Sequence, residues 1–225
     1  MSILNIQLRK LLQLFYADDR LRRSLLLTDI RSDARKDGGG TRSTGGDFYG
    51  PFWADAKAHV AGTLDLTQQT EIRIAKNKRR SRLYPLLRDA SLHLFNERLR
   101  WSNKPLEIHL ENLHGHFEIA EIAATVRLKD VMFARVRARL DERTYLIYPY
   151  FSEKPSLPDE GARLGLWAMS TALSDHPSNH MRVVDLLPRA LFSPTTHSLV
   201  GDEREILLRR YRALILERER LKERR

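Results

Sequence analysis

The chain has 225 residues, and its 39 Lys and Arg outnumber its 29 Asp and Glu, which gives a net charge of +10. A surplus of this size attracts polyanions, of which nucleic acids are the commonest. The alternatives are an acidic protein, an anionic membrane surface, or a basic surface that only serves solubility. The absence of cysteine excludes disulfides and thiolate metal sites, and it fits a reducing compartment.

The N-terminal sequence is MSILNIQLRKLLQLFYADDRLRR, and charged residues interrupt it every few positions. It therefore lacks the continuous apolar segment of a signal peptide. Elsewhere, no run approaches the ~18 apolar residues that a membrane-spanning helix requires. We expect a cytoplasmic protein that has no membrane partner.

The first fifty residues predict a helical arm followed by a loop. Leucines between residues 3 and 27 approximate a helical stripe with a break near Ala17, which predicts an N-terminal helical arm over residues 1–32. Five glycines between residues 38 and 46 indicate a Gly-rich loop over residues 33–50, because glycine is costly to order in helices and strands. The loop lacks the GxxxxGK[ST] spacing of a phosphate loop, so a flexible linker is favoured.

Residues 52–100 predict further helices. The first is expected to end at Gly62, and Thr67 offers a weak cap for the next. Pro85 should kink or restart the helix that follows, since proline removes an amide donor and clashes with the preceding turn.

The periodicity changes after Pro105. Apolar and polar residues then alternate, as in strands, and a turn is expected at Asp141-Glu142-Arg143. Residues 105–195 therefore predict a sheet-containing core, with a helix that starts at Asp159 and a short strand within MRVVDLLPRALFS. Residues 201–223 predict a long charged helix, whose inner edge is formed by Leu207, Tyr211, Leu214 and Leu221.

This order of elements predicts an α/β or α+β fold. We expect a mixed central sheet of about four to five strands flanked by helices, an N-terminal helical region and a long C-terminal helix. The main body is expected to span residues 51–225.

A cluster of basic residues is the sharpest local feature. We call residues 76–82, with the sequence KNKRRSR, the basic segment; no acidic residue lies between Glu71 and Asp89. Such a cluster suits phosphate contacts, because each bound phosphate releases counterions. On a continuous helix the side chains would spread around most of the circumference. The predicted nucleic-acid-binding residues are Lys76, Lys78, Arg79, Arg80 and Arg82. The alternative is a solvated helix face, or a cluster that pairs with an acidic partner.

The pattern strand–strand–helix–strand between about Glu107 and Ser193 suggests a family. ARVRARLDERTYLIYPYFSEKPS supplies the two strands, DEGARLGLWAMSTAL the helix, and MRVVDLLPRALFS the last strand. In this layout the segment resembles the core of the PD-(D/E)XK nuclease superfamily, in its RecB-like branch. The resemblance implies a helix, a strand with an acid, a strand ending in D-x-K, a helix with a Q-x-x-x-Y motif, and a further strand. An unrelated sheet protein with the same order is the competing interpretation.

The residues that the resemblance would make catalytic are missing from their expected positions. The first acid falls on Arg137, the D-x-K triplet on Pro149-Tyr150-Phe151, and the helical pair near Arg163 and Trp167. Nucleases of this kind hold Mg²⁺ with carboxylate oxygens, which Arg, Pro and Phe do not supply. The resemblance therefore implies a core that does not cleave.

Relocated acids remain the fallback for catalysis. Glu153 and Lys154 lie just past the second strand and are the best candidates, with Mg²⁺ as the cofactor only in that case; otherwise no cofactor is expected. A metal site built on His109, His114 and His116 is disfavoured, because no further ligand is defined.

Three functional hypotheses follow from the sequence. The leading one is a nucleic-acid-binding protein, with DNA as the expected partner, that serves as an accessory subunit of a bacterial-type DNA-processing, mobile-element or defence system. The second is an active Mg²⁺- or Mn²⁺-dependent nuclease with relocated acids. The third is an interaction module whose C-terminal helix binds an acidic protein.

Overall fold

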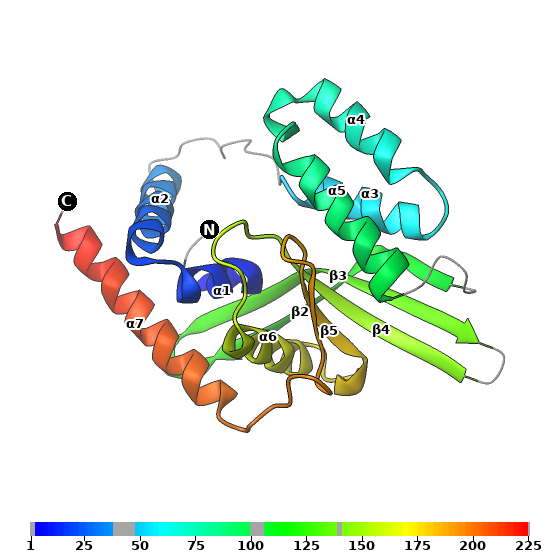
Figure 1. Cartoon of the computed structure of the whole chain (residues 1–225). Helices are drawn as coiled ribbons and strands as arrows, with labels where there is room; N and C mark the ends of the chain where they lie inside the picture. The colour runs from blue at the N-terminus through cyan, green and yellow to red at the C-terminus, as the bar shows by residue number, and fades with distance from the viewer. Residues whose placement is uncertain (1–2, 38–47, 100–105, 139–140, 225) are drawn as a thin grey trace.

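The computed structural model describes residues 3–37, 48–99, 106–138 and 141–224. A mixed sheet lies between two layers of helices, which confirms the predicted α/β class (Figure 1). One layer contains α1 (Leu8–Tyr16), α2 (Asp19–Asp37), α6 (Asp159–Ala172) and α7 (Glu203–Glu223). The other contains α3 (Gly50–Val60), α4 (Leu66–Lys76), η1 (Lys78–Arg80), α5 (Leu83–His93) and η2 (Leu94–Arg98).

Six described strands form the sheet, rather than the four or five expected. They are β1 (Asn5–Gln7), β2 (Leu106–Ile119), β3 (Ala124–Ala138), β4 (Asp141–Tyr150), β5 (Met181–Asp185) and β6 (Ala190–Phe192). β2, β3 and β4 form an antiparallel meander, and β5 lies parallel to β4 after the α6 crossover. β6 pairs antiparallel with β5, so the single strand expected in this stretch is a hairpin.

β3 changes its neighbour halfway along its length. Its first half pairs with β1 in parallel, at Thr125–Arg127, and its second half pairs with β4 from Met132 onward. Between the two halves, Lys129 and Asp130 face the single residue His114 of β2, which makes a one-residue bulge. Asp130 adopts a left-handed φ of 67° there. The bulge also reverses the alternation of β3 side chains between the two faces of the sheet. Val126 and Leu128 precede the bulge and Val131 follows it, yet all three belong to the same core cluster.

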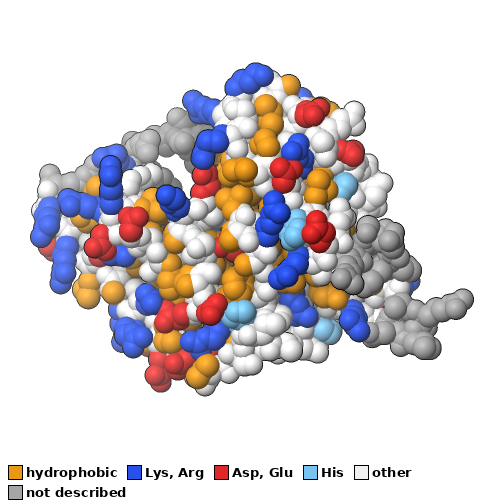
Figure 2. Space-filling model, viewed as in Figure 1, with side chains coloured by type: hydrophobic (Ala, Val, Ile, Leu, Met, Phe, Trp, Pro, Cys, Tyr) orange, Lys and Arg blue, Asp and Glu red, His pale blue; other side chains and the backbone are white. Residues whose placement is uncertain are grey.

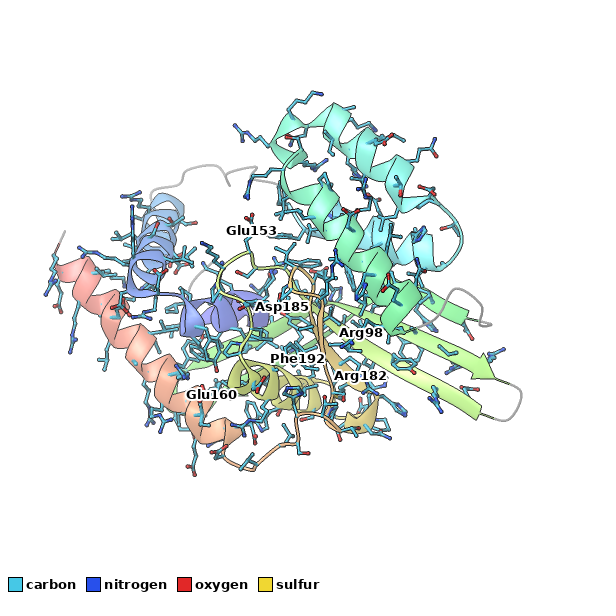
Figure 3. All side chains as sticks on the ribbon, in the orientation of Figure 1. Arg98, Glu153, Glu160, Arg182, Asp185 and Phe192 are labelled. Atoms are coloured by element: carbon cyan, nitrogen blue, oxygen red, sulfur yellow. The ribbon has the colours of Figure 1, made fainter. Side chains whose placement is uncertain are left out.

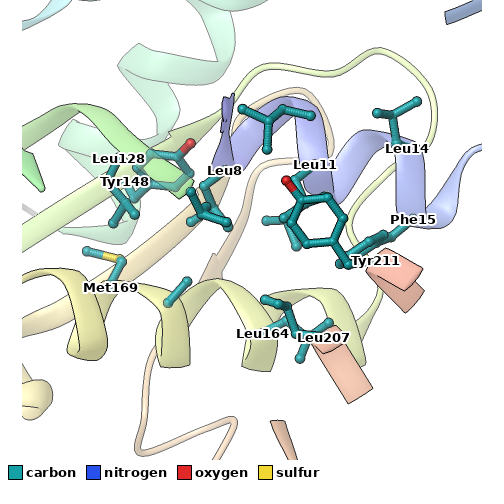
Figure 4. Close-up of a cluster of buried hydrophobic side chains, with 14 of the residues drawn as sticks. Leu8, Leu11, Leu14, Phe15, Leu128, Tyr148, Leu164, Met169, Leu207 and Tyr211 are labelled. Carbon is teal, nitrogen blue, oxygen red and sulfur yellow. The ribbon is translucent and has the colours of Figure 1, made fainter. Parts of the chain in front are cut away.

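The larger core cluster packs α1, α6 and α7 on one face of the sheet. Leu8, Leu11 and Leu12 of α1 are fully buried, as their i, i+3, i+4 spacing on one helix face requires. They meet Leu128 and Tyr148 of the sheet, and Leu164, Met169, Leu207 and Tyr211 of the helices (Figure 4). Gly115 of β2 admits the end of α6, since a Cβ there would lie 2.6 Å from the carbonyl oxygen of Ala172.

The smaller core cluster holds α3, α4 and α5 on the other face. Phe52, Trp53, Tyr84 and Phe95 pack over Met132, Ala134, Val136, Ile147 and Val184. Trp53 also donates a hydrogen bond of 2.8 Å from Nε1 to the carbonyl oxygen of Asp130. This contact ties α3 to the β3 bulge.

The N-terminal segment differs from the expected arm over residues 1–32. β1 is a strand of the sheet, and α1 lies in the main core, so these residues belong to the same body as the rest. The expected break near Ala17 is present, between α1 and α2. Most of the predicted Gly-rich loop, residues 38–47, lies outside the described residues.

Some of the local predictions are confirmed, and others are wrong. α6 begins at Asp159, α5 restarts at Leu83 just before Pro85, and Leu207, Tyr211, Leu214 and Leu221 of α7 are buried, all as predicted. The cap of α4 is Asp65, whose Oδ1 accepts a hydrogen bond from the Gln68 amide, and the cap predicted at Thr67 is wrong. The turn predicted at Asp141-Glu142-Arg143 is also wrong, because these residues pair with β3.

Candidate nucleic-acid interface

The basic segment is a turn between two helices, and the continuous helix considered for it is wrong. α4 ends at Lys76, and Asn77 leaves the helix with a φ of −149°. The Asn77 side chain then accepts a hydrogen bond from the Arg79 amide and starts η1. Asn and similar residues interrupt helices in this way because their side chains replace backbone hydrogen-bond partners. The turn gathers the charges at one end of the α3–α5 unit (Figure 2).

The five basic side chains of this turn have different surroundings. Lys76, Lys78 and Arg79 are exposed, and within the described part of the chain no ion pair involves them. The guanidinium carbon of Arg80 lies 5.2 Å from the centre of the Tyr84 ring. Arg82 is exposed and holds Glu153 through two hydrogen bonds, of 2.7 and 2.6 Å. Three of the five predicted residues are therefore available for phosphate contacts without breaking another contact.

A pocket of about 560 Å³ is connected to the basic segment through the ion pair between Arg82 and Glu153. Glu153, the partner of Arg82, is one of its lining residues and comes from the loop that follows β4 (Figure 3). The opposite wall is formed by α1 and α2, and the pocket is lined by Gln13, Asp18, Arg20, Leu21, Ser24, Tyr49, Glu153 and Lys154. The predicted fallback residues Glu153 and Lys154 therefore line the same pocket, and Arg82 of the basic segment contacts Glu153.

Hydrogen bonds fix the loop that carries Glu153 and Lys154. The Gln13 amide donates to Ser152 Oγ and to the Lys154 carbonyl oxygen, at 3.1 and 3.3 Å. Ser152 Oγ donates to the same carbonyl at 2.7 Å. Further along, Asp185 Oδ2 accepts a hydrogen bond of 2.7 Å from the Leu157 amide. The loop is therefore held at both ends, which fixes the side of the pocket that Glu153 and Lys154 line.

Asp185 at the end of β5 is a buried carboxyl group with one unsatisfied oxygen. The residue is fully buried, and within the described residues Oδ1 has no hydrogen-bond partner. Burial raises the pKa of Asp185 to about 6, although the bond from Leu157 acts in the opposite direction. The charged form is disfavoured because the surroundings cannot replace the water that it loses.

Asp185 makes a testable contribution to the pH dependence of stability. Because its pKa in the folded state is raised above that in the unfolded chain, ionisation of the folded protein costs stability as the pH rises from about 4 to above 6. Asp185→Asn should therefore gain more stability at pH 8 than at pH 4, by roughly 2 kcal/mol. Urea unfolding of both proteins at the two pH values measures this difference. An equal effect at both values would contradict the assignment.

Asp130 is a further acidic residue near the end of β4. Met132 of β3 pairs with Ile147 of β4, and the two strands are antiparallel. Two residues before Met132, Asp130 therefore lies near Pro149, close to the end of β4. Lys57 of α3 is almost fully buried, which lowers its pKa, and the Asp130 charge raises it in part. The same charge contributes to the raised pKa of buried Tyr148. The register of β3 places Asp130 beside β4. The sequence signal that could have pointed to it is the polar Lys129-Asp130 pair, at which the apolar alternation reverses.

The positions suggested by the nuclease resemblance do not converge on this pocket. Arg137 lies near the end of β3, away from the bulge, and its guanidinium is 2.9 Å from Glu107. Arg163 of α6 pairs with Glu203 at 3.0 Å, and Trp167 packs edge-on against Phe117. Of the triplet, Tyr150 donates a hydrogen bond to the Pro155 carbonyl oxygen.

The described residues contain no group of three or more His, Asp or Glu side chains placed to hold a metal ion. His114 and His116 are exposed on β2 beside a separate pocket of about 300 Å³ that also contains Arg127 and Lys129. His109 instead packs edge-on against Phe133. Among the described residues, these three histidines are therefore not gathered into one group.

The ion pair between Arg82 and Glu153 makes a second prediction. If phosphate binds this surface, Glu153 competes for Arg82, so Glu153→Gln should strengthen binding of an oligonucleotide about fivefold at low salt. Fluorescence anisotropy of a labelled oligonucleotide measures the change. Glu121→Gln is the matched control, because it releases Arg204 from a similar exposed pair on another surface. Equal gains in both variants would show an effect of net charge alone.

No protein-family model matches the chain, and no curated protein or solved structure matches it. Within the described residues, none of the helices combines the length and the apolar character needed to cross a membrane.

Proposed function

We propose that this protein binds nucleic acid through the basic segment and does not cleave it. The observation that carries the proposal is the α4–α5 turn, where Lys76, Lys78 and Arg79 are exposed and unpaired within the described residues. Arg82 of the same turn binds Glu153, which lines a pocket and lies on a loop held by hydrogen bonds. Such a surface binds phosphates mainly through counterion release, so it needs no base contacts for affinity.

The order of the core elements supports the nuclease-like part of the proposal. After the helices α1 to α5, three antiparallel strands, a crossover helix and a parallel strand follow as β2 to β4, α6 and β5. The end of β4, where a nuclease of this layout would hold metal, carries Pro149, Tyr150 and Phe151. In this proposal the core is a scaffold, and the protein is an accessory subunit of a DNA-processing, mobile-element or defence system.

One observation favours the nuclease alternative enough to test it. Asp130 lies near the end of β4, and Glu153 and Lys154 follow that strand. However, Arg82 forms an ion pair with Glu153, and buried Lys57 lies near enough to Asp130 for their charges to interact. Glu153 is therefore already paired with a cation, and the charge of Asp130 interacts with that of Lys57. Cleavage of plasmid DNA with Mg²⁺ or Mn²⁺ that is lost in Glu153→Gln or Asp130→Asn would establish the nuclease instead.

The interaction-module alternative has less support. The buried edge of α7 packs in the larger core cluster, so this helix is a structural part of the body. Its outer side carries only one exposed large apolar residue, Leu216, among the residues described. A nuclease-resistant stoichiometric partner in a pull-down would favour this alternative.

Filter binding at several salt concentrations tests the proposed function. With duplex and single-stranded DNA and with RNA, we expect affinity to fall steeply between 50 and 200 mM salt, because phosphate contacts dominate. Affinity that does not respond to salt would contradict binding through this cluster. The same assay determines which nucleic acid binds best.

A further inference from the structure

The pocket beside the basic segment has the composition of a site for one nucleotide. Tyr49 lines it and is stacked on Phe151, with ring centres 5.1 Å apart and planes at 11°. Arg9 holds this pair from α1, with its guanidinium carbon 4.8 Å from the Tyr49 ring centre. Phe151 covers one face of the Tyr49 ring, so a base would stack on the part of Tyr49 that lines the pocket. Stacking of this kind is a main source of affinity for unpaired nucleotides.

The charges of the pocket separate a place for phosphate from a place for a base. Arg20 and Lys154 line it and form no ion pair with another described residue, so both can meet a phosphate. Asp18 accepts a hydrogen bond from the Leu21 amide at the start of α2, and Glu153 accepts one from Arg82. These carboxylates disfavour a second phosphate inside the pocket. A base, which is uncharged, is not excluded by them.

Hydrogen-bonding groups complete the pocket. The Gln13 amide nitrogen is used by Ser152 and Lys154, which fixes the side chain and directs its hydrogen-bonding capacity for a ligand to the oxygen. Ser24 adds a hydroxyl group from the exposed side of α2. A volume of about 560 Å³ is within the range of small-ligand sites. The site therefore has room and partners for a base edge.

From this arrangement we propose that the pocket receives one unpaired nucleotide of the bound nucleic acid. A base inside a duplex is stacked and paired, and it does not reach such a pocket without leaving the helix. The protein should therefore prefer single-stranded nucleic acid, or the unpaired end of a duplex, over an uninterrupted duplex. This inference rests on the proposed function, since the basic segment supplies the neighbouring phosphate contacts.

The test uses the 225-residue chain, single-stranded DNA and RNA oligomers of one sequence, and the corresponding DNA duplex. Tyr49→Leu should weaken single-strand binding about tenfold, because it removes a stacking surface, and should leave duplex binding within about twofold. Tyr145→Leu is the matched control, since Tyr145 also lies under an arginine, Arg182 at 5.5 Å, and lines a separate pocket. Its affinities should match those of the wild type.

A second variant covers the case in which Tyr49→Leu fails to fold. Ser24→Leu narrows the pocket from the exposed side of α2 without changing charge, and it should also reduce single-strand binding selectively. Equal loss for single strand and duplex, or no loss in either folded variant, overturns the nucleotide pocket while the proposed function stands. Failure of the wild type to bind any of the oligomers overturns both. A larger effect with RNA than with DNA, or the reverse, identifies the sugar that the pocket accepts.

Discussion

Replacing Lys76, Lys78 and Arg79 together with Gln is expected to reduce nucleic-acid affinity by roughly two orders of magnitude at 50 mM salt. The reason is that these three exposed side chains form no ion pair within the described residues, so each can neutralise a phosphate and release counterions. The slope of log affinity against log salt should become shallower by about 2.7 for duplex DNA, or 0.9 for each contact.

A matched control separates a local contact from the effect of net charge. Arg209, Arg212 and Arg220 are exposed on α7, and replacing them with Gln removes the same total charge. This control variant should keep nearly the wild-type salt slope. Extending the first variant to Arg80 and Arg82 should raise the slope change to about 4–5. Equal slope changes in the two triple variants would show diffuse attraction by the whole surface.

The second large effect is expected for the stability of the fold, from Arg218→Ala. Arg218 of α7 is buried and lies 2.7 Å from Asp33 and 3.5 Å from Asp29 of α2. Asp29 is itself buried and binds Lys10 of α1 at 2.7 Å. Removing the guanidinium leaves buried carboxylate charge behind, which typically costs about 3–5 kcal/mol.

Urea unfolding measures this loss against an exposed pair. Arg82→Ala likewise removes an arginine that binds a carboxylate. However, the Arg82 side chain is 73% exposed, whereas that of Arg218 is only 6% exposed. Exposed pairs contribute about 0–1 kcal/mol, so this control should be nearly as stable as the wild type. A loss in Arg218→Ala no greater than that in the control would contradict the role of the buried network in holding α7.

The elements with strong local signals were predictable from the sequence. The stripe of α6, its start at Asp159 and the buried edge of α7 follow from periodicity and capping alone. β1 was not predictable in this way, because its three residues are extended only through pairing with Thr125–Arg127, far along the chain. The cap at Asp65 was missed because Thr67 offered a competing hydroxyl group.

The candidate site was predictable in its charges but not in its geometry. The sequence identifies Lys76 to Arg82, yet it does not show that Asn77 ends the helix, or that Arg82 reaches Glu153 71 residues away. The pocket combines residues of α1, α2 and the loop after β4, which only tertiary packing brings together. Asp130 depends on a bulge, and a shift of one residue in the register is not visible in composition.

The most direct test of the central claim is one experiment with the wild-type protein, a labelled oligonucleotide and Mg²⁺ or Mn²⁺. The bound fraction is measured by anisotropy across salt concentrations, and the same samples are then resolved on a denaturing gel. Binding that weakens steeply with salt while the oligonucleotide stays intact is the predicted result. Cleaved product, or the absence of salt-dependent binding, would contradict the claim.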